Sequence, residues 1–248
     1  LLYENCPQQY KFYNELEFTA VRTGSVMFGQ LLHQTIEDIH KAVLKGERDS
    51  LTNDKIEGWF NINYHLLSKQ MRSYLHQPQQ KALLRQILNY RDKNNGNWDN
   101  IVEAEVDVSL VKENYILKGT IDLIKGKNGT VELVDFKSGD KPDVNANDDI
   151  TRGTLDRYRR QLEVYAHLVE ERTGYKVSKM HLHYPKEENG NPYITFNKNE
   201  NTINKTIETF DKVVENIEKK NFDNSHIKRN NKQCGDCDMR YYCNPRQY

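Results

Sequence analysis

The sequence has no long hydrophobic run and no excess of charge of either sign. None of its apolar stretches approaches the roughly 18–20 residues of a membrane-spanning helix, and its N-terminus lacks a basic segment followed by an apolar one. We therefore expect a cytoplasmic protein without membrane contacts. Lysine plus arginine and aspartate plus glutamate number 36 each, so there is no basic field over the whole chain, although a local groove could still be positive.

The chain also lacks internal repeats and linkers rich in proline or glycine. Nothing in its 248 residues therefore marks a domain boundary, and we expect one domain over residues 1–248. The first residue is Leu1 rather than methionine, which favours a piece of a larger protein. A Gly-x4-Gly-Lys-Ser/Thr loop is missing too, so any ATP-driven step must come from elsewhere.

Apolar periodicity predicts helices in the N-terminal part of the chain, followed by strands. Spacings of three and four predict an amphipathic helix over residues 24–46, which contains His33, and one or two helices over 54–90, broken near Pro78. Alternating and continuous apolar runs then predict strands, and later segments predict a helix, two strands and a last helix. The strands are expected at 101–111, 115–126, 130–139, 176–185 and 192–196, and the later helices at 155–174 and 201–220. This order predicts an α/β fold centred on a three-stranded meander.

The hairpin at the centre of this meander contains charged residues inside apolar runs. If Asn128 and Gly129 form the two-residue loop of a type I′ turn, Lys127 pairs with Thr130 and Asp122 faces Asp135. Residues two apart on a strand share a face, so Lys137 is expected beside both acids. The register therefore predicts a patch with two carboxylates and one ammonium group.

Two opposed carboxylates in an apolar setting repel each other, and a divalent cation would neutralise them. Oxygen donors suit Mg²⁺ or Mn²⁺. The alternative is a solvated edge hairpin with an Asp–Lys ion pair, because Asp-x-Lys is a common tripeptide. Glu105, on the preceding predicted strand with Glu103 and Asp107, is either a further acid of this site or part of an exposed acidic stripe.

The four cysteines lie near the chain ends, at Cys6, Cys234, Cys237 and Cys243. Short spacing in the tail lets thiolates converge, and in an intracellular protein metal ligation is preferred to disulfides. Four thiolates can hold a tetrahedral Zn²⁺ or a [4Fe–4S] cluster, and spacing alone does not choose between them.

The hairpin residues also carry a family resemblance. Gly119 and Asp122 form a Gly-x-x-Asp motif, and Asp135 and Lys137 form Asp-x-Lys in the next strand. This pair of motifs resembles the core of the PD-(D/E)XK nucleases, in the branch that includes the RecB-type nuclease domains. The resemblance implies a restriction-endonuclease-like core, with a central mixed sheet flanked by helices.

That branch also has a histidine on an upstream helix and a Gln-x-x-x-Tyr motif on the helix after the core strands. His33, Gln161 and Tyr165 occur here in the same order. Alone, His33 would be read as a core histidine, and the Gln–Tyr pair as ordinary helix surface, although residues four apart share a helix face. The resemblance implies a metal site formed by His33, Asp122, Asp135 and the carbonyl of Phe136. It implies a catalytic set of Asp122, Asp135, Lys137, Gln161 and Tyr165.

The implied function is metal-dependent hydrolysis of DNA phosphodiester bonds. The resemblance further implies a RecB-like exonuclease that acts on single-stranded DNA. It would work with a helicase domain or subunit in DNA repair or recombination. One cysteine before the core and three after it resemble the iron–sulfur staple of AddB-type nuclease domains, so the implied cluster is [4Fe–4S], with Zn²⁺ as the alternative. A rival hypothesis is a catalytically silent, nuclease-like DNA-binding or scaffold domain of a helicase complex.

Overall fold

A computed structural model describes residues 2–19, 24–145, 148–224, 234–235 and 237–243. The chain divides into two compact units, one of Leu1–Val21 with Lys205–Tyr248 and one of Arg22–Asn204. In the described parts of the chain, no helix combines the length and the apolar character needed to cross a membrane.

The larger unit contains one five-stranded sheet with the order β1-β2-β3-β4-β5. The first three strands form the predicted antiparallel meander, β4 runs parallel to β3, and β5 is antiparallel to β4. The strands are β1 (Ile101–Val111), β2 (Ile116–Lys127), β3 (Thr130–Phe136), β4 (Lys176–His183) and β5 (Tyr193–Asn197). The predicted α/β fold with a mixed central sheet is confirmed.

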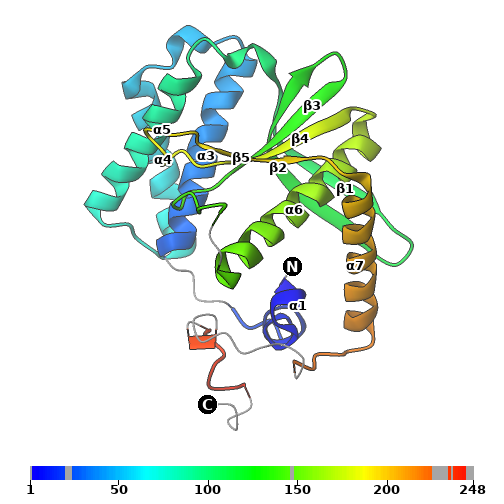
Figure 1. Cartoon of the computed structure of the whole chain (residues 1–248). Coiled ribbons are helices and arrows are strands. Elements are labelled where there is room, and N and C mark those ends of the chain that lie inside the picture. The colour runs from blue at the N-terminus through cyan, green and yellow to red at the C-terminus, as the bar shows by residue number, and fades with distance from the viewer. Residues whose placement is uncertain (1, 20–23, 146–147, 225–233, 236, 244–248) are drawn as a thin grey trace. The chain divides into compact units, whose positions relative to one another are not determined.

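Helices flank this sheet. In Figure 1, α3 (Gly24–Leu44), α4 (Asn53–Met71) and α5 (Gln77–Asn94) pack together at the left, and α6 (Asp149–Thr173) lies at the right beside β1 and β4. The main core joins residues of α3, α4 and α5 to Leu123, Val134 and Phe136 of β2 and β3. Because α6 connects two parallel strands, it is the crossover helix that such a pair requires.

Helix boundaries follow local capping chemistry. The predicted 54–90 region forms two helices, with Pro78 in the first turn of α5, where a missing N–H costs nothing. Helix α6 begins six residues before the predicted start, because the Asp148 side chain caps the N–H of Thr151 at 2.8 Å. It ends as predicted at Gly174, whose φ of 72° is left-handed.

The smaller unit contains short N-terminal helices and the tail. Its helices are α1 (Leu2–Asn5), α2 (Pro7–Tyr10), the π-helix η1 (Lys11–Glu15) and most of α7 (Glu200–Glu218). Gln8 Nε2 donates to the carbonyl of Phe222 at 3.0 Å, and Tyr13 Oη donates to Asp238 Oδ2 at 3.1 Å. Direct hydrogen bonds therefore tie the two ends of the chain together. The remaining short helices, of the 3₁₀ type, are η2 (Arg48–Ser50) and η3 (Trp98–Asn100) in the larger unit.

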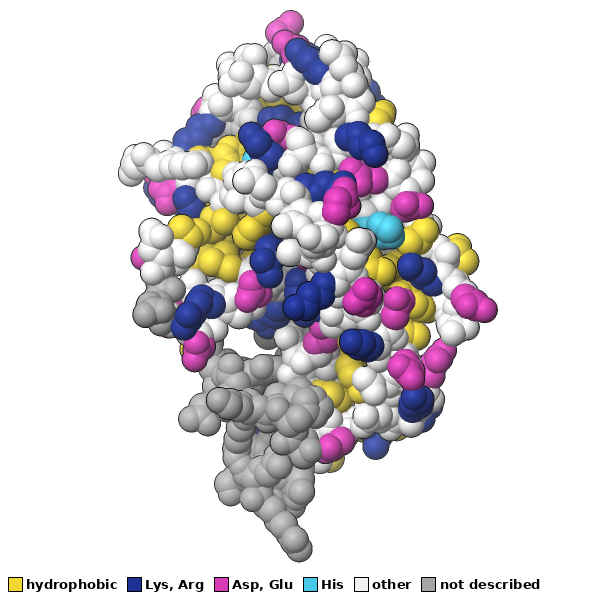
Figure 2. All heavy atoms as spheres, turned by 45° about the vertical axis from the view of Figure 1, so that its right-hand side comes forward, with side chains coloured by type: hydrophobic (Ala, Val, Ile, Leu, Met, Phe, Trp, Pro, Cys, Tyr) yellow, Lys and Arg dark blue, Asp and Glu magenta, His cyan; other side chains and the backbone are white. Residues whose placement is uncertain are grey.

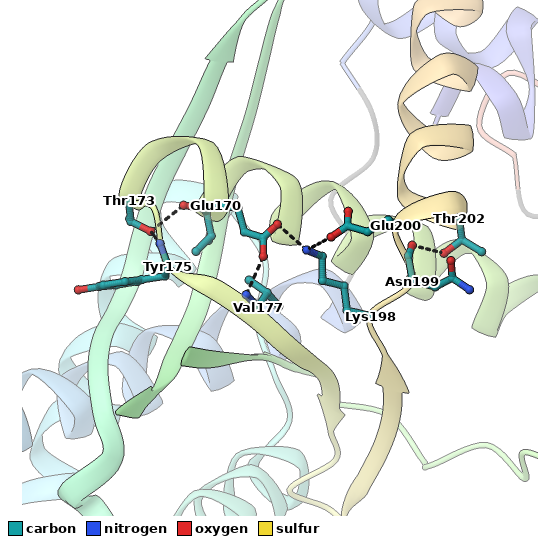
Figure 3. Close-up of polar contacts among 9 residues, drawn as sticks. Glu170, Thr173, Tyr175, Val177, Lys198, Asn199, Glu200 and Thr202 are labelled. Carbon is teal, nitrogen blue, oxygen red and sulfur yellow. Dashed lines mark hydrogen bonds and ion pairs between the residues drawn. The ribbon is translucent and has the colours of Figure 1, made fainter. Parts of the chain in front are cut away.

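The C-terminal end of α6 is anchored by one carboxylate. Glu170 accepts the N–H of Val177 at 2.8 Å and contacts Lys198 Nζ at 2.6 Å, and Lys198 also pairs with Glu200 (Figure 3). Lys198 has only 12% of its side chain exposed, and Glu170 only 19%. This pair links α6 to the start of β4 and to the end of β5.

Removing this lysine should destabilise the fold. We expect Lys198→Met to lower the free energy of unfolding by about 1–3 kcal/mol, because Glu170 keeps its charge but loses a largely buried partner. The matched control is Lys179→Met, since Lys179 lies 3.9 Å from Glu132 with half of its side chain exposed. That change should cost under about 1 kcal/mol. Urea unfolding measures both, and equal losses would contradict the special role of Lys198.

A second network lies beneath the end of β3. Phe136 is 1% exposed, and its ring contacts those of His40, Tyr90 and His183 at centroid distances of 5.8, 5.2 and 5.3 Å. His40 Nε2 and Tyr90 Oη lie 2.7 Å apart. Burial lowers the pKa of both His40 and His183 to about 3, so both rings are neutral in the folded state near neutral pH.

These two histidines should make the fold sensitive to acid. In the unfolded chain their pKa is about 6.5, so the unfolded state binds more protons between pH 6.5 and 3, and stability falls as pH falls through that window. From pH 7 to about pH 5, His40 alone should account for a loss of about 2 kcal/mol. We expect His40→Gln to show a correspondingly smaller acid loss in urea unfolding. An unchanged pH dependence would show that His40 does not titrate in this way.

Candidate metal and catalytic site

The turn between β2 and β3 sets the register that the site depends on. Asn128 and Gly129 both have positive φ, 54° and 78°, as a type I′ turn requires. The paired residues run from Lys127 with Thr130 to Leu123 with Val134, which confirms the predicted register. The next residues along the two strands are Asp122 and Asp135.

Asp122 is held against β3 by its side chain. Its Oδ2 accepts the backbone N–H of Phe136 at 2.6 Å, beyond the last backbone pair of the two strands. Asp122 and Asp135 are 8% and 5% exposed. The two acids are therefore adjacent and buried between neighbouring strands, so the alternative of a solvated edge hairpin is wrong in its exposure, although its Asp–Lys ion pair is present.

Asp135 faces the lysine and the glutamine that sequence reasoning placed beside it. Its Oδ2 lies 2.6 Å from Lys137 Nζ, and its Oδ1 accepts from Gln161 Nε2 at 3.3 Å. Burial raises the pKa of Asp135 to about 6, against the lowering effect of Lys137 and with a further increase from Asp122. Burial thus favours the protonated form of Asp135, and Lys137 opposes this effect.

Lys137 follows directly after β3 and is fixed from several sides. Its backbone N–H donates to the carbonyl of His183 at 2.8 Å, and its Nζ donates to Gln161 Oε1 at 3.4 Å. The Nζ also lies 4.2 Å from the ring centroid of Tyr158, within the range of a cation–π contact. Sequence reasoning missed Tyr158. Its position three residues before Gln161, on the same helix face, is the signal that could have identified it.

Gln161 and Tyr165 meet as predicted, with Gln161 Nε2 donating to Tyr165 Oη at 2.9 Å. The phenol ring lies directly against Gly119. A Cβ at Gly119 would be 2.5 Å from Tyr165 Cε1, which is closer than real carbon contacts allow. The glycine of the Gly-x-x-Asp motif therefore makes room for the tyrosine of the Gln-x-x-x-Tyr motif.

His33 and Glu105 complete the site on the other side of Asp122. His33 Nδ1 lies 3.1 Å from Asp122 Oδ1. Glu105 sits on β1 across from Asp122, between the pairs Ala104–Leu123 and Val106–Ile121. Ligand atoms of His33, Glu105 and Asp122 all lie within 4.8 Å of one another.

In this group of three, burial and the charge of Asp122 shift the pKa values of its two partners, Glu105 and His33. Burial and the nearby Asp122 carboxylate raise the pKa of Glu105 to about 8. Burial lowers the pKa of His33, but the hydrogen bond and charge of Asp122 outweigh this and raise it overall. Glu105 also has a left-handed backbone, with φ of 47°, which is uncommon for a residue with a side chain. It belongs to the site, whereas Glu103 pairs with Arg172 and Asp107 accepts from Thr120.

The donor set fits a divalent cation. One imidazole nitrogen and the carboxylate oxygens of two acids, converging in a half-buried group, are ligands that Mg²⁺ and Mn²⁺ accept. Asp135 lies beside this group rather than in it. The predicted role of the Phe136 carbonyl stays a prediction, because the recorded contact of Phe136 with Asp122 is through its N–H.

The cysteines lie in the other unit and do not form a comparable group. Cys6 Sγ accepts from Gln9 N at 3.4 Å, and Cys237 Sγ accepts from Gln9 Nε2 at 3.8 Å. Burial raises the pKa of the Cys243 thiol, and the other three cysteines add to the effect. All four thiols are free. Among the described residues, the group with metal-ligand spacing is the one at Asp122, so the predicted iron–sulfur cluster is not shown.

One face of the molecule shows no extended patch of a single charge sign. Figure 2 shows lysine and arginine side chains interspersed with aspartate and glutamate. On α6, Arg159 lies 3.2 Å from Asp156, and Arg157 donates to Thr154 Oγ1 at 3.1 Å. Both arginines therefore have partners within their own helix.

Comparisons with known proteins identify the family of this chain. A model of the PD-(D/E)XK nuclease superfamily matches residues 2–244. A candidate exonuclease from Eubacterium rectale has a similar crystal structure, with a TM-score of 0.52 and 12% identity over 97% of this chain and 88% of that one. The crystal structure of SSO0001 is more distant, with a TM-score of 0.36 and 16% identity over 95% of this chain and 94% of that one. No curated protein matches.

The family match covers nearly the whole chain, and the E. rectale structure shares its fold. The mixed sheet, its flanking helices and the order of the motif residues are consistent with a restriction-endonuclease-like core. This chain therefore belongs to the PD-(D/E)XK nuclease superfamily.

Proposed function

We propose that the protein is a metal-dependent DNA nuclease that hydrolyses phosphodiester bonds. The observation that carries this proposal is the direct adjacency of two groups, brought together by Asp122 on β2 and Asp135 on β3. One is the cation-attracting group of His33, Glu105 and Asp122, and the other is the pair of Asp135 and Lys137. A phosphate that reaches this place would meet both.

His33, Glu105 and Asp122 would hold the cation, with Asp135 at its edge. A bound Mg²⁺ or Mn²⁺ supplies a water of lowered pKa and offsets negative charge on the phosphate. Lys137 places a positive charge where negative charge grows on the phosphate during hydrolysis. Because its ammonium group is already in position, it does not have to move as the reaction proceeds. Gln161 holds Asp135 and Lys137 through opposite ends of its amide, and the Tyr158 ring supports the ammonium group.

We further propose a RecB-like exonuclease that acts with a helicase domain or subunit in DNA repair or recombination. The order of His33 and of the Gly-x-x-Asp, Asp-x-Lys and Gln-x-x-x-Tyr motifs along the chain supports this, and the name of the E. rectale relative is in line with it. Its DNA would be single-stranded, and the protein would be cytoplasmic.

The test is cleavage of end-labelled single- and double-stranded DNA by anaerobically purified protein, with Mg²⁺, Mn²⁺ or EDTA. Cutting that requires the metal supports the nuclease, and the product ladder distinguishes exonuclease from endonuclease. Tight DNA binding without cutting, with metal bound and with a helicase partner supplied, would instead favour a silent binding or scaffold domain.

For the tail, we propose that Cys6, Cys234, Cys237 and Cys243 hold a [4Fe–4S] cluster that staples the N-terminal segment to the tail within a single nuclease domain. The mutual influence of the thiols on the pKa of Cys243 supports their proximity. Iron and sulfide analysis with visible absorption tests this. Stoichiometric zinc in a colourless protein would assign Zn²⁺ to the same thiols.

A further inference from the structure

Two cavities meet at His33. The smaller, of about 260 Å³, is lined by His33, Phe136, Lys137 and Tyr158 among others, and so lies on the reaction side of the site. The larger, of about 580 Å³, lies between α3 and α4 and also reaches His33. The mechanism proposed above uses the first cavity and leaves the second without a role.

We call the second one the glutamine cavity. The side chains that give it its chemistry are Gln30, Gln34, Gln70, Leu67 and Met71. Leu67 and Met71 are buried, at 2% and 6% exposed, and provide an apolar surface. Within the described part of the chain, no lysine, arginine, aspartate or glutamate lines it. It is therefore neither a phosphate site nor a second cation site.

The lining matches a flat, neutral ligand with donors and acceptors on its edge. The amides of Gln30 and Gln34 each carry two donor hydrogens and an acceptor oxygen, which is the pairing capacity that glutamine uses toward the edges of nucleobases. Apolar side chains suit the faces of such a ring. The volume is also within the range of roughly 300–1,000 Å³ that small-molecule sites occupy.

We propose that the glutamine cavity binds one unpaired nucleobase of the strand being cut, next to the phosphate at His33. This inference rests on the proposed nuclease function and deepens it. Bases in a duplex are stacked and paired, so only a single-stranded or extruded base can enter such a cavity. The cavity therefore gives a structural reason for a preference for single-stranded ends or segments.

Its position relative to the cut can be tested with modified strands. Single-stranded oligonucleotides carry one normal phosphodiester and phosphorothioates at all other linkages. The normal linkage is the 5′-terminal, the 3′-terminal or an internal one, so that an exonuclease of either polarity or an endonuclease can cut it, and one abasic site is placed in turn at each position around it. The wild type should cut the strand with the abasic site at one particular position roughly tenfold more slowly, by kcat/KM, because one base edge paired with an amide contributes about that much. Other positions should have little effect.

Variants of residues that line the glutamine cavity then test whether the base at that position is the one that the cavity binds. In Gln30→Leu/Gln34→Leu, the ratio between intact and abasic strands at that position should fall toward one. Val26→Trp, at a rim position that is 48% exposed, should have the same effect by filling the space. Gln77→Leu, an exposed glutamine on α5, is the matched control and should keep the wild-type ratio. Thermal unfolding and Mn²⁺ binding verify that each variant is folded with an intact metal site.

The outcomes separate the two proposals. Absence of metal-dependent cutting in the wild type would overturn the nuclease itself. Normal cutting without any position-specific abasic effect, or an effect that both cavity variants retain, would overturn the nucleobase site and leave the nuclease standing.

Discussion

Lys137→Ala should lower the rate of DNA cleavage by roughly 10²–10³-fold, the loss typical when one preorganised charge-stabilising group is removed. The change should leave Mn²⁺ affinity nearly unchanged, because Lys137 contacts Asp135 and Gln161 and stands outside the group of His33, Glu105 and Asp122. Single-turnover cleavage of a labelled strand and calorimetric Mn²⁺ titration measure the two effects separately.

The split between rate and metal binding distinguishes this role from a structural one. A variant that simply unfolds the site would lose both together. Lys81→Ala, an exposed lysine on α5, serves as the matched control and should cut DNA at the wild-type rate. Cleavage by Lys137→Ala at an undiminished rate would remove Lys137 from the mechanism.

Glu105→Gln should weaken Mn²⁺ binding by at least the roughly 10–100-fold seen when supporting groups of a metal site are lost. It keeps the size of the side chain but removes one of three converging ligands. Calorimetric titration at about pH 6.5, 7.5 and 8.5 adds a second readout, since a ligand must lose its proton to bind metal. With the pKa of Glu105 raised to about 8, wild-type affinity should rise with pH over this range, and the variant should show a shallower rise.

Glu103→Gln is the matched control for this experiment. Glu103 lies two residues away on β1 and pairs with Arg172 at 3.0 Å, so its loss should leave both the affinity and its pH dependence unchanged. Equal Mn²⁺ affinity in wild type and Glu105→Gln would show that Glu105 is not a ligand.

The parts of this site that sequence could predict are those governed by local rules. The turn chemistry of Asn128 and Gly129 determined the register, and the register brought Asp122 next to Asp135. The helical spacing of Gln161 and Tyr165 likewise implied a shared face, and their contact at 2.9 Å confirms it. In each case, residues close together in the sequence are sufficient to determine the geometry.

The parts that sequence could not predict depend on packing between distant elements. The left-handed backbone of Glu105 occurs inside a strand without any glycine or turn signal. The rings of His40, Tyr90 and His183 come from two helices and a strand, and meet only because all three pack on Phe136. No local pattern marks these residues as neighbours.

The parallel pairing of β3 with β4 has a consequence for how the protein acquires its site during folding. Lys137 is positioned through the carbonyl of His183, which follows it in the chain only after the whole of α6. Contacts between parts of the chain so distant form slowly, because the entropy of closing the intervening segment is lost before the contact is gained. The antiparallel hairpin with Asp122 and Asp135 can form early, but the lysine reaches its place only when β4 docks. During folding, the two acids should therefore come together before the site has its lysine in place.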